Sequence, residues 1–297
     1  MKATAPPRRR LLGPAARPAA TRRRRGRSWL PAHLLAWGYT ALLAVPLYYF
    51  LVSAFKDNDA IFADPLGLPS GLSLDNFTDA FGNADLGLAI ANSALVTAFA
   101  LVLTLGLAVP AAFALARSTG RAAAVMERIF SLGFLIPTFA ALFPTFLLAA
   151  VTGLYQTRAF IVLLLPATAM PLSIVILTQF MRTIPREMEE AARMDGAGTF
   201  AVLRHVYAPM CGPGIATVVL LNFLSFWNEY LYSLIIIGPD PAQRTIQVAL
   251  PTLKSVTGTQ YGVLTAGTVL TLIPVYVVYT VLQKRMQQAL ISGAVKM

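Results

Sequence analysis

The chain has 297 residues, of which 57% are apolar and only 12% are charged, and its formal net charge at pH 7 is +11. An ordinary soluble domain carries about 25% charged residues, so this composition cannot cover a surface that faces water. It excludes a soluble globular protein. One cysteine and two widely separated histidines leave no internal disulfide and no paired spacing for a metal site, so we expect neither.

Residues 1–28 form a basic N-terminal tail with ten Lys and Arg residues. The tail has no aromatic residues between the cations, as binding to nucleic acid by base stacking would require. The apolar run that follows has about 25 residues, which exceeds the length of about 7–15 that is typical of a cleavable signal core. We therefore expect a disordered cytoplasmic tail that is attracted to anionic lipid headgroups and precedes an uncleaved first span.

Six apolar runs are each long enough to cross a bilayer core of about 30 Å. Backbone amides find no water in hydrocarbon, so each run predicts a transmembrane helix. Five of the runs contain an internal proline, which bends a helix, and the bends fit either simple packing geometry or a bundle shaped around a cavity. The runs cover about residues 30–54, 88–116, 129–151, 159–181, 214–237 and 262–282.

Lys and Arg indicate the orientation, because cytoplasmic loops near the ends of spans keep positive charge. Twenty of the 24 Lys and Arg residues lie in the N-terminal tail, in the loops at 117–128 and 182–213, and in the C-terminal tail at 283–297. The sequence therefore predicts an all-α membrane protein with six transmembrane helices in one domain, residues 29–297, and with both termini in the cytoplasm.

The cytoplasmic loop at residues 183–209 predicts two short helices. Pro185 suits a first helical position, and the glutamates that follow it place negative charge near the positive end of the helix dipole. Gly196 ends this helix by accepting a left-handed conformation, and Thr199 can cap a second helix. The second helix, at about 200–207, has an apolar stripe of Phe200, Leu203, Val206 and Tyr207.

This loop has the features of a docking surface. Ala191 and Ala192 are small enough for another surface to approach the backbone, while Glu189 or Glu190 offers a carboxylate to a cation of a partner. The alternative is an amphipathic pair of helices that lies on the membrane surface with its charges solvated.

The spacing of Glu190-Ala191-Ala192, Asp195-Gly196-Ala197, Pro209 and Pro213 resembles the EAA loop of ABC-importer permeases. The resemblance implies coupling helices that lie in a cleft of the ATP-hydrolysing subunit. Ala208 departs from the pattern, since the family commonly has a larger aliphatic residue before this proline. The residues implied in ATPase coupling are Glu189, Glu190, Ala191, Ala192, Asp195, Gly196, Ala197 and Pro209.

The resemblance covers about residues 30–297 and narrows to carbohydrate importers of the maltose and glycerol-phosphate type. It rests on Asn92-Ser93 and residues 111–117 in the second span, residues 227–231 in the fifth, and residues 290–296 at the C-terminus. It implies the type I ABC importer permease fold. It also implies that Gly293 and Lys296 contact the ATPase pair.

The implied function is that of a permease subunit in the bacterial plasma membrane, which translocates a carbohydrate delivered by an extracytoplasmic binding protein. The other implied partners are a second permease, which completes a heterodimer, a homodimeric ATP-binding subunit and the lipid bilayer, but no nucleic acid. The chain lacks the Gly-x-x-x-x-Gly-Lys-Ser/Thr loop that cradles nucleotide phosphates, so we expect no enzyme activity and no cofactor on this chain, with ATP and Mg on the partner ATPase. The alternative is a stand-alone ion-driven secondary transporter, which needs coupling-ion ligands near the midplane of the membrane.

Glu229 is the only ionisable residue well inside a predicted span, where a charge is costly. Together with Asn222, Ser225 and Ser233 it has spacings of three, four and four residues, which align on one face of a helix. We expect this face to line the solute passage; the alternative is a structural hydrogen bond from Glu229 to a neighbouring helix. The candidate pathway residues are Asn222, Ser225, Trp227, Asn228 and Glu229.

Overall fold

The computed structural model describes residues 29–83, 85–238, 240–255 and 258–294. The tail predicted at residues 1–28 and the candidate contact residue Lys296 lie outside these ranges. The chain divides into two compact units, residues 1–46 and 47–297. The described part of the first unit belongs to a single helix, α1 (Trp29–Ser53), which continues past Pro46 into the second unit.

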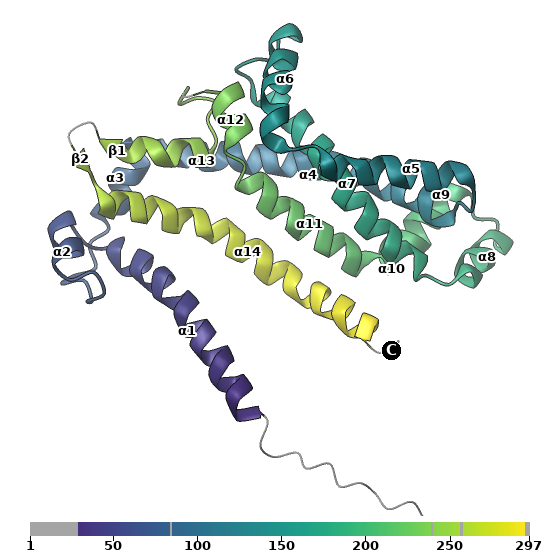
Figure 1. The fold of residues 1–297 in the computed structure, drawn as a ribbon, viewed down its shortest axis with the longest axis horizontal. Coiled ribbons are helices and arrows are strands. Elements are labelled where there is room, and N and C mark those ends of the chain that lie inside the picture. The colour runs from purple at the N-terminus through teal and green to yellow at the C-terminus, as the bar shows by residue number, and fades with distance from the viewer. Residues whose placement is uncertain (1–28, 84, 239, 256–257, 295–297) are drawn as a thin grey trace, which may run out of the picture. The chain divides into compact units, whose positions relative to one another are not determined.

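Long helices in contact with one another make up most of the second unit (Figure 1). The buried residues of α4 recur every three or four positions, so they lie on one face, and many are small, such as Ala89, Ser93, Ala100 and Ala108. Small residues let helix backbones approach closely inside a bilayer, where van der Waals packing holds helices together. This face of α4 (Leu86–Arg117) packs mainly on α7 (Arg158–Arg182), while α11 (Gly212–Trp227) contacts α4, α7 and α14 (Tyr261–Ala294).

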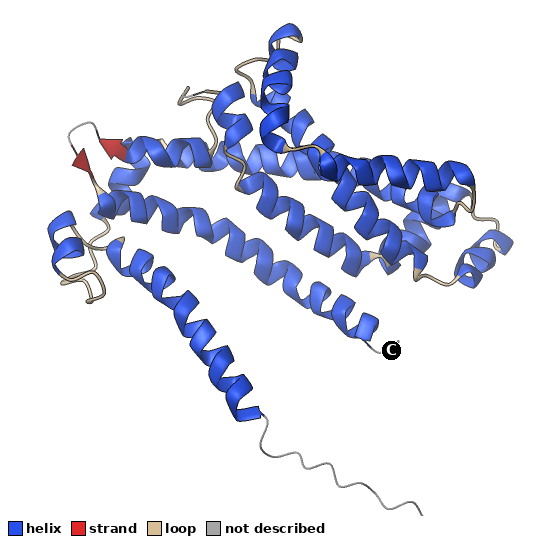
Figure 2. Ribbon diagram, viewed as in Figure 1, coloured by secondary structure: helices blue, strands red, loops and turns tan. Residues whose placement is uncertain are grey.

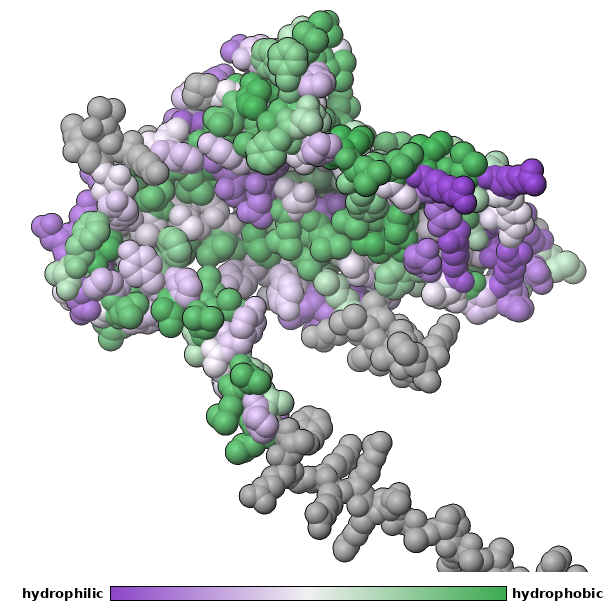
Figure 3. All heavy atoms as spheres, viewed as in Figure 1, coloured by the Kyte–Doolittle hydropathy of each residue, from purple (hydrophilic) through white to green (hydrophobic). Residues whose placement is uncertain are grey.

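The outward faces of these helices carry large apolar side chains. Phe99, Val102 and Leu163 are all more than half exposed. Figure 3 shows apolar side chains over much of the visible surface, while hydrophilic side chains gather at the end of the second unit that carries α5 (Arg121–Leu132) and α8 (Arg186–Met194). A bundle with an apolar exterior is suited to lipid, because lipid supplies an apolar surround that water does not.

Four helices in the described ranges, α1, α4, α7 and α14, are long and apolar enough to cross a membrane. Two pairs of helices joined by a sharp bend raise the number to six if each pair is one span. The pairs are Arg121–Leu135 with Thr138–Val151, bent by 98°, and Thr199–Met210 with Gly212–Trp227, bent by 76°. This agrees with the predicted number of spans and with the all-α fold class, although two of the predicted runs are not continuous helices.

The predicted span at residues 129–151 is broken. α5 (Arg121–Leu132) continues as the 3-10 turn η1 (Gly133–Leu135), and the chain then bends by 98° into α6 (Thr138–Val151). Pro137 explains the bend, since it has no N–H to continue the helix and favours extended backbone at Ile136, whose ψ is 108°. The hydropathy pattern could not predict this break, because the sequence is apolar on both sides of it.

The predicted span at residues 214–237 is also two helices. α11 ends at Trp227, and α12 (Leu231–Ile236) begins after an interruption at residues 228–230. The C-terminal part of the chain also differs from the prediction. We expected a tail at residues 283–297, but α14 continues as far as Ala294, so Gly293 is helical.

Short elements connect the long helices at the end of the second unit opposite α8 (Figure 2). They include a small antiparallel hairpin, the only strand pair among the described residues, which we did not predict. The elements are α2 (Asn58–Ala63), α3 (Asp75–Asn83), α13 (Ile246–Ala249), η3 (Leu250–Leu253), β1 (Lys254–Ser255) and β2 (Gly258–Thr259).

Candidate functional site: the loop at residues 183–209

The first part of the loop is the nine-residue helix α8. It covers Arg186–Met194, so Asp195 and Gly196 follow its end as predicted, while Pro185 is the residue before the helix instead of its first residue. Gly196 has a φ of +84° and donates its N–H to the carbonyl of Arg193, while the N–H of Ala197 is 2.9 Å from the carbonyl oxygen of Ala192. These two bonds form a Schellman motif, which satisfies carbonyls that the end of a helix leaves without partners. Gly196 therefore ends α8 by its backbone conformation.

The second part of the loop differs from the single capped helix that we predicted. α9 (Thr199–Val202) is followed by a π-helical turn, η2 (Leu203–Tyr207), and by α10 (Ala208–Met210). The residue before α9 is Gly198, and no side chain caps the helix, so the predicted capping role of Thr199 is wrong. Pro209 lacks the N–H that an α-helix would donate to the carbonyl of residue 205, and a wider turn accommodates this loss.

Glu189 lies on the inner side of α8 and is only 7% exposed. One carboxylate oxygen, Oε2, is 2.5 Å from Nη2 of Arg117 and accepts a hydrogen bond of 3.2 Å from the hydroxyl of Tyr207. The other, Oε1, accepts a hydrogen bond of 3.0 Å from Nε of Arg193. We call Glu189, Arg117, Arg193 and Tyr207 the Glu189 cluster.

Tyr207 completes the cluster as a fully buried aromatic ring that precedes the membrane helix α11. The Arg117 guanidinium lies 5.4 Å from the centre of the ring, and the ring of Phe113 meets it edge to face at 4.9 Å. Burial raises the pKa of the Tyr207 hydroxyl; the positive charge of Arg117 lowers it and the negative charge of Glu189 raises it. The hydroxyl therefore stays protonated at neutral pH and donates to Glu189.

The two adjacent glutamates lie in different surroundings. Of the two carboxylates expected to face a partner as alternatives, Glu189 is bound inside the chain, which leaves Glu190 for that role. Glu190 is exposed. The two alanines are divided in the same way, because Ala191 is exposed and Ala192 packs on the core.

The exposed side of α8 has its own periodicity. Seven of the nine residues of α8 are exposed, and four of them recur at spacings of three, one and three residues, which place these four on one face of the helix. The face combines carboxylates with an apolar side chain, Met194, that is 89% exposed. We call this set the outer face of α8: Glu187, Glu190, Ala191 and Met194.

The apolar stripe that we predicted in the second part of the loop is only partly buried. Leu203 and Tyr207 are buried, but Phe200 is 73% exposed. Phe200 therefore adds a large apolar side chain to the surface of this loop.

The predicted pathway residues do not share one helical face, because the helix is interrupted at residues 228–230. Asn222 is buried and donates to the hydroxyl of Ser173 on α7 at 2.8 Å. Trp227 is also buried, and its Nε1 donates to the carbonyl of Thr271 on α14. Both residues connect neighbouring helices, whereas Ser225 and Asn228 are exposed.

Glu229 caps α12. Its carboxylate accepts hydrogen bonds from the backbone N–H groups of Tyr232 at 2.6 Å and Ser233 at 2.9 Å, and from the Ser233 hydroxyl at 2.6 Å. These are N–H groups that the first turn of a helix leaves without partners. A charge at the start of α12 also has a favourable interaction with the helix dipole.

Sequence reasoning missed a cavity of about 280 Å³ beside this cap. It lies at the bend between α5 and α6, where Thr138, Thr145 and Thr168 lie near the aromatic ring of Tyr232. The prolines at 137 and 171 were the available signal, but they indicated only bends.

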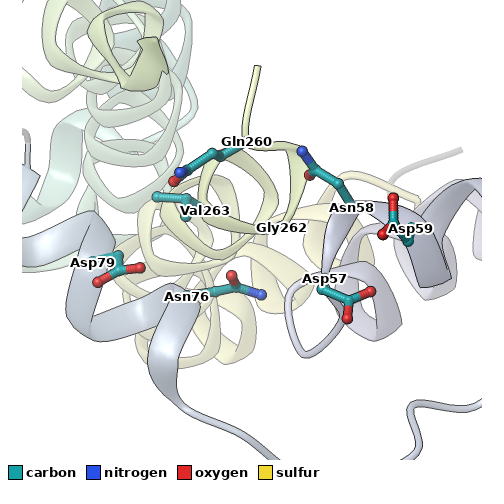
Figure 4. Close-up of a pocket in the computed structure, with 8 residues that line it drawn as sticks. All are labelled: Asp57, Asn58, Asp59, Asn76, Asp79, Gln260, Gly262 and Val263. Carbon is teal, nitrogen blue, oxygen red and sulfur yellow. The ribbon is translucent and has the colours of Figure 1, made fainter. Parts of the chain in front are cut away.

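A second cavity, of about 350 Å³, lies at the end of the second unit that carries the short connecting elements. Its walls come from α2, α3 and the start of α14 (Figure 4). It is polar and acidic, being lined by Asp57, Asp59, Asp79, Asn58, Asn76, Gln260, Gly262 and Val263.

Comparison with known proteins places these features in a family. The sequence profile of the family described as "Binding-protein-dependent transport system inner membrane component" matches residues 105–292. A diacetylchitobiose uptake system permease protein of Streptomyces coelicolor is 32% identical over 279 residues, which cover 94% of this chain and 92% of that protein. A melibiose/raffinose/stachyose import permease protein of Bacillus subtilis is 28% identical over 254 residues, 85% of this chain and 91% of the relative.

The fold is similar to that of a solved transporter. A chain of a bacterial ABC transporter involved in the import of the acidic polysaccharide alginate matches with a TM-score of 0.73 and 25% identity, over 86% of this chain and 95% of that chain. Another structure of a bacterial alginate ABC transporter, in complex with an alginate pentasaccharide-bound periplasmic protein, matches with a TM-score of 0.61 and 16% identity, and so shares the fold.

Proposed function

Because the chain belongs to the family of inner membrane components of binding-protein-dependent transport systems, we propose that it forms one half of the translocation pathway of a bacterial carbohydrate ABC importer. A second permease completes the membrane part, and a homodimeric subunit binds ATP and Mg and hydrolyses ATP. An extracytoplasmic binding protein delivers the solute. Both termini of the chain lie in the cytoplasm of a cell whose plasma membrane the helices cross.

The outer face of α8 carries this proposal. It presents Glu190, Ala191 and Met194 outward, while the inner side of the same helix is held by buried contacts. A surface with a small residue, a carboxylate and an exposed apolar side chain suits a cleft in a partner that contains a cation. We assign this face to the ATPase, with Gly293 and Lys296 as a second contact.

Mechanical coupling follows from this arrangement. If the ATPase binds the outer face of α8 with different affinity in its nucleotide states, the permease shifts between its inward-open and outward-open conformations. The sharp bends between α5 and α6 and between α10 and α11, together with the interruption between α11 and α12, supply places at which the bundle can bend without the loss of regular hydrogen bonds.

A carbohydrate is the solute class that we propose. Three of the similar proteins are named for a carbohydrate: diacetylchitobiose, melibiose/raffinose/stachyose and alginate. In this chain, the cavity at the α5–α6 bend brings three threonines and the Tyr232 ring together. Hydroxyl groups and an aromatic ring are the groups that recognise the polar edges and the apolar faces of sugars.

Labelling of engineered cysteines tests the orientation. Cys211 is buried, so it interferes little with reagents in solution. Glu190→Cys should react with a membrane-impermeant maleimide in inside-out vesicles and remain unlabelled in right-side-out vesicles, and Asp59→Cys, on the opposite end, should do the reverse. Labelling of Glu190→Cys in right-side-out vesicles would place α8 beyond the reach of a cytoplasmic ATPase.

Reconstitution tests the class of transporter. The chain, a second permease and an ATPase subunit should copurify, and solute uptake by liposomes that contain the complex should require ATP. Uptake driven by this chain without an ATPase would favour the ion-driven carrier.

A further inference from the structure

On the basis of the proposed function, we propose that Glu189 is the positioning residue that couples the docking helix to the membrane bundle. It connects α8 to Arg117 at the end of α4 and to Tyr207 before α11. Glu190 makes the contact with the ATPase, and its neighbour Glu189 transmits the resulting movement into the chain.

The first argument is that α8 has few other attachments. Of its nine residues, Glu189 is the only one that is buried. Ala192 packs on the apolar core but is small. A helix of this length has little stability by itself, so its position depends on the contacts that its inner side makes. The strongest of these contacts are polar, and they converge on one carboxylate.

The second argument is the placement of the partners of Glu189. Arg117 is the last residue of α4, where a cation also interacts favourably with the negative end of the helix dipole. Tyr207 ends the π-helical turn that leads through α10 into α11. Phe113, one helical turn before Arg117, packs against the Tyr207 ring. The end of α4 and the segment that leads into α11 therefore meet at the carboxylate of a third helix, α8.

The third argument is burial. Arg117 has 19% of its side chain exposed and Glu189 has 10%, whereas Arg193 has 49% exposed. An exposed ion pair contributes little, so the pair of Glu189 with Arg193 is secondary. Removal of Glu189 leaves the Arg117 charge and the Tyr207 hydroxyl without their partner in a mostly buried place, which is strongly unfavourable.

A second ion pair at the same end of the bundle provides a matched control. Arg182 and Glu127 form a bidentate pair, at 2.9 and 3.0 Å, that joins α7 to α5. Their side chains are 38% and 28% exposed, and neither residue belongs to α8. A general loss of negative charge at the cytoplasmic end affects both pairs, but only Glu189 holds the docking helix.

The test uses the reconstituted complex of this chain with the second permease and the ATPase, and it measures ATP hydrolysis and solute uptake in the same liposomes. Glu189→Gln should still copurify with the ATPase, but solute taken up per ATP should fall by about tenfold, as expected for the loss of a coupling interaction between two sites. Glu127→Gln should leave this ratio unchanged. Glu190→Ala should instead reduce copurification of the ATPase.

A charge exchange provides the decisive readout. The double change Arg117→Glu and Glu189→Arg is made with Arg193→Ala, so that Arg193 does not repel the new arginine, and Arg193→Ala alone is the reference. If the exchange restores solute uptake per ATP, the result supports the proposal. This holds even if the complex with Glu189→Gln alone does not assemble. Normal coupling in Glu189→Gln, or no recovery on exchange, overturns it. A wild-type chain that never binds an ATPase refutes the proposed function instead.

Discussion

Gly196 is a position where one methyl group has an effect that the structure allows us to estimate. Its φ of +84° lies in the left-handed region, and a Cβ added there has no neighbouring heavy atom within 4 Å. The effect of Gly196→Ala therefore comes from backbone strain alone, without a steric clash. Left-handed backbone costs a residue other than glycine roughly 1–2 kcal/mol.

Gly198 provides the matched control two residues away. It also has open space around the position of a Cβ, but its φ is −72°, which any residue adopts. Gly198→Ala should be neutral, or stabilising by about 0.4–1 kcal/mol because alanine has fewer conformations in the unfolded chain. The two changes add the same methyl group to the same loop, so their difference isolates the conformation at Gly196.

Hydrogen exchange measures the difference where it arises. The N–H of Ala197 bonds to the carbonyl of Ala192 and closes the end of α8. In Gly196→Ala, exchange at residues 196 and 197 should accelerate by about 5- to 30-fold, the factor that corresponds to 1–2 kcal/mol of local opening. Equal exchange rates in the two variants would show that the left-handed turn does not hold the end of the helix.

Two further predictions concern the interior of the bundle. Asn222→Ala should lower the stability of the purified protein in detergent by about 0.6–2 kcal/mol, the range for hydrogen bonds between membrane helices, because Ser173 loses its partner; an unchanged melting temperature would contradict this. Glu229→Ala should destabilise α12 by about 0.5–2 kcal/mol through the loss of its cap, whereas Glu229→Gln keeps an oxygen acceptor and should cost less. Equal melting temperatures for the two Glu229 variants would refute the capping role, and a change in solute affinity in Glu229→Gln with unchanged stability would favour a role in the passage.

Hydropathy predicted the membrane helices because a span needs a long apolar run, and this requirement is local in the sequence. The interruption at Pro137 was harder to predict, since prolines elsewhere in the same chain, such as Pro110 and Pro166, lie within continuous helices, and the interruption at residues 228–230 contains no proline at all. Whether a proline breaks a helix depends on the neighbours that replace the lost hydrogen bond. At the second interruption, the carboxylate of Glu229 accepts hydrogen bonds from backbone N–H groups of α12. The spacing of residues in the sequence does not reveal such a bond.

The loop illustrates a second limit. The boundaries of α8 followed from Pro185 and Gly196, because both residues act on the local backbone, whereas the π-helical turn in the second half of the loop was not predicted. The division of roles between Glu189 and Glu190 did not, since the two residues are chemically identical and their difference depends on Arg117, which is far away in the sequence. Tertiary contacts alone decide which of the two carboxylates is buried.

The two adjacent glutamates also restrict the length of α8. Successive residues of an α-helix point about 100° apart, so an inserted or deleted residue between Pro185 and Glu189 would rotate the remainder of the helix by that angle. The carboxylate now beside Arg117 would turn toward the cytoplasm, and a different side chain would enter the interior. We therefore expect natural variation along this stretch to exchange residue types but to keep the number of residues constant.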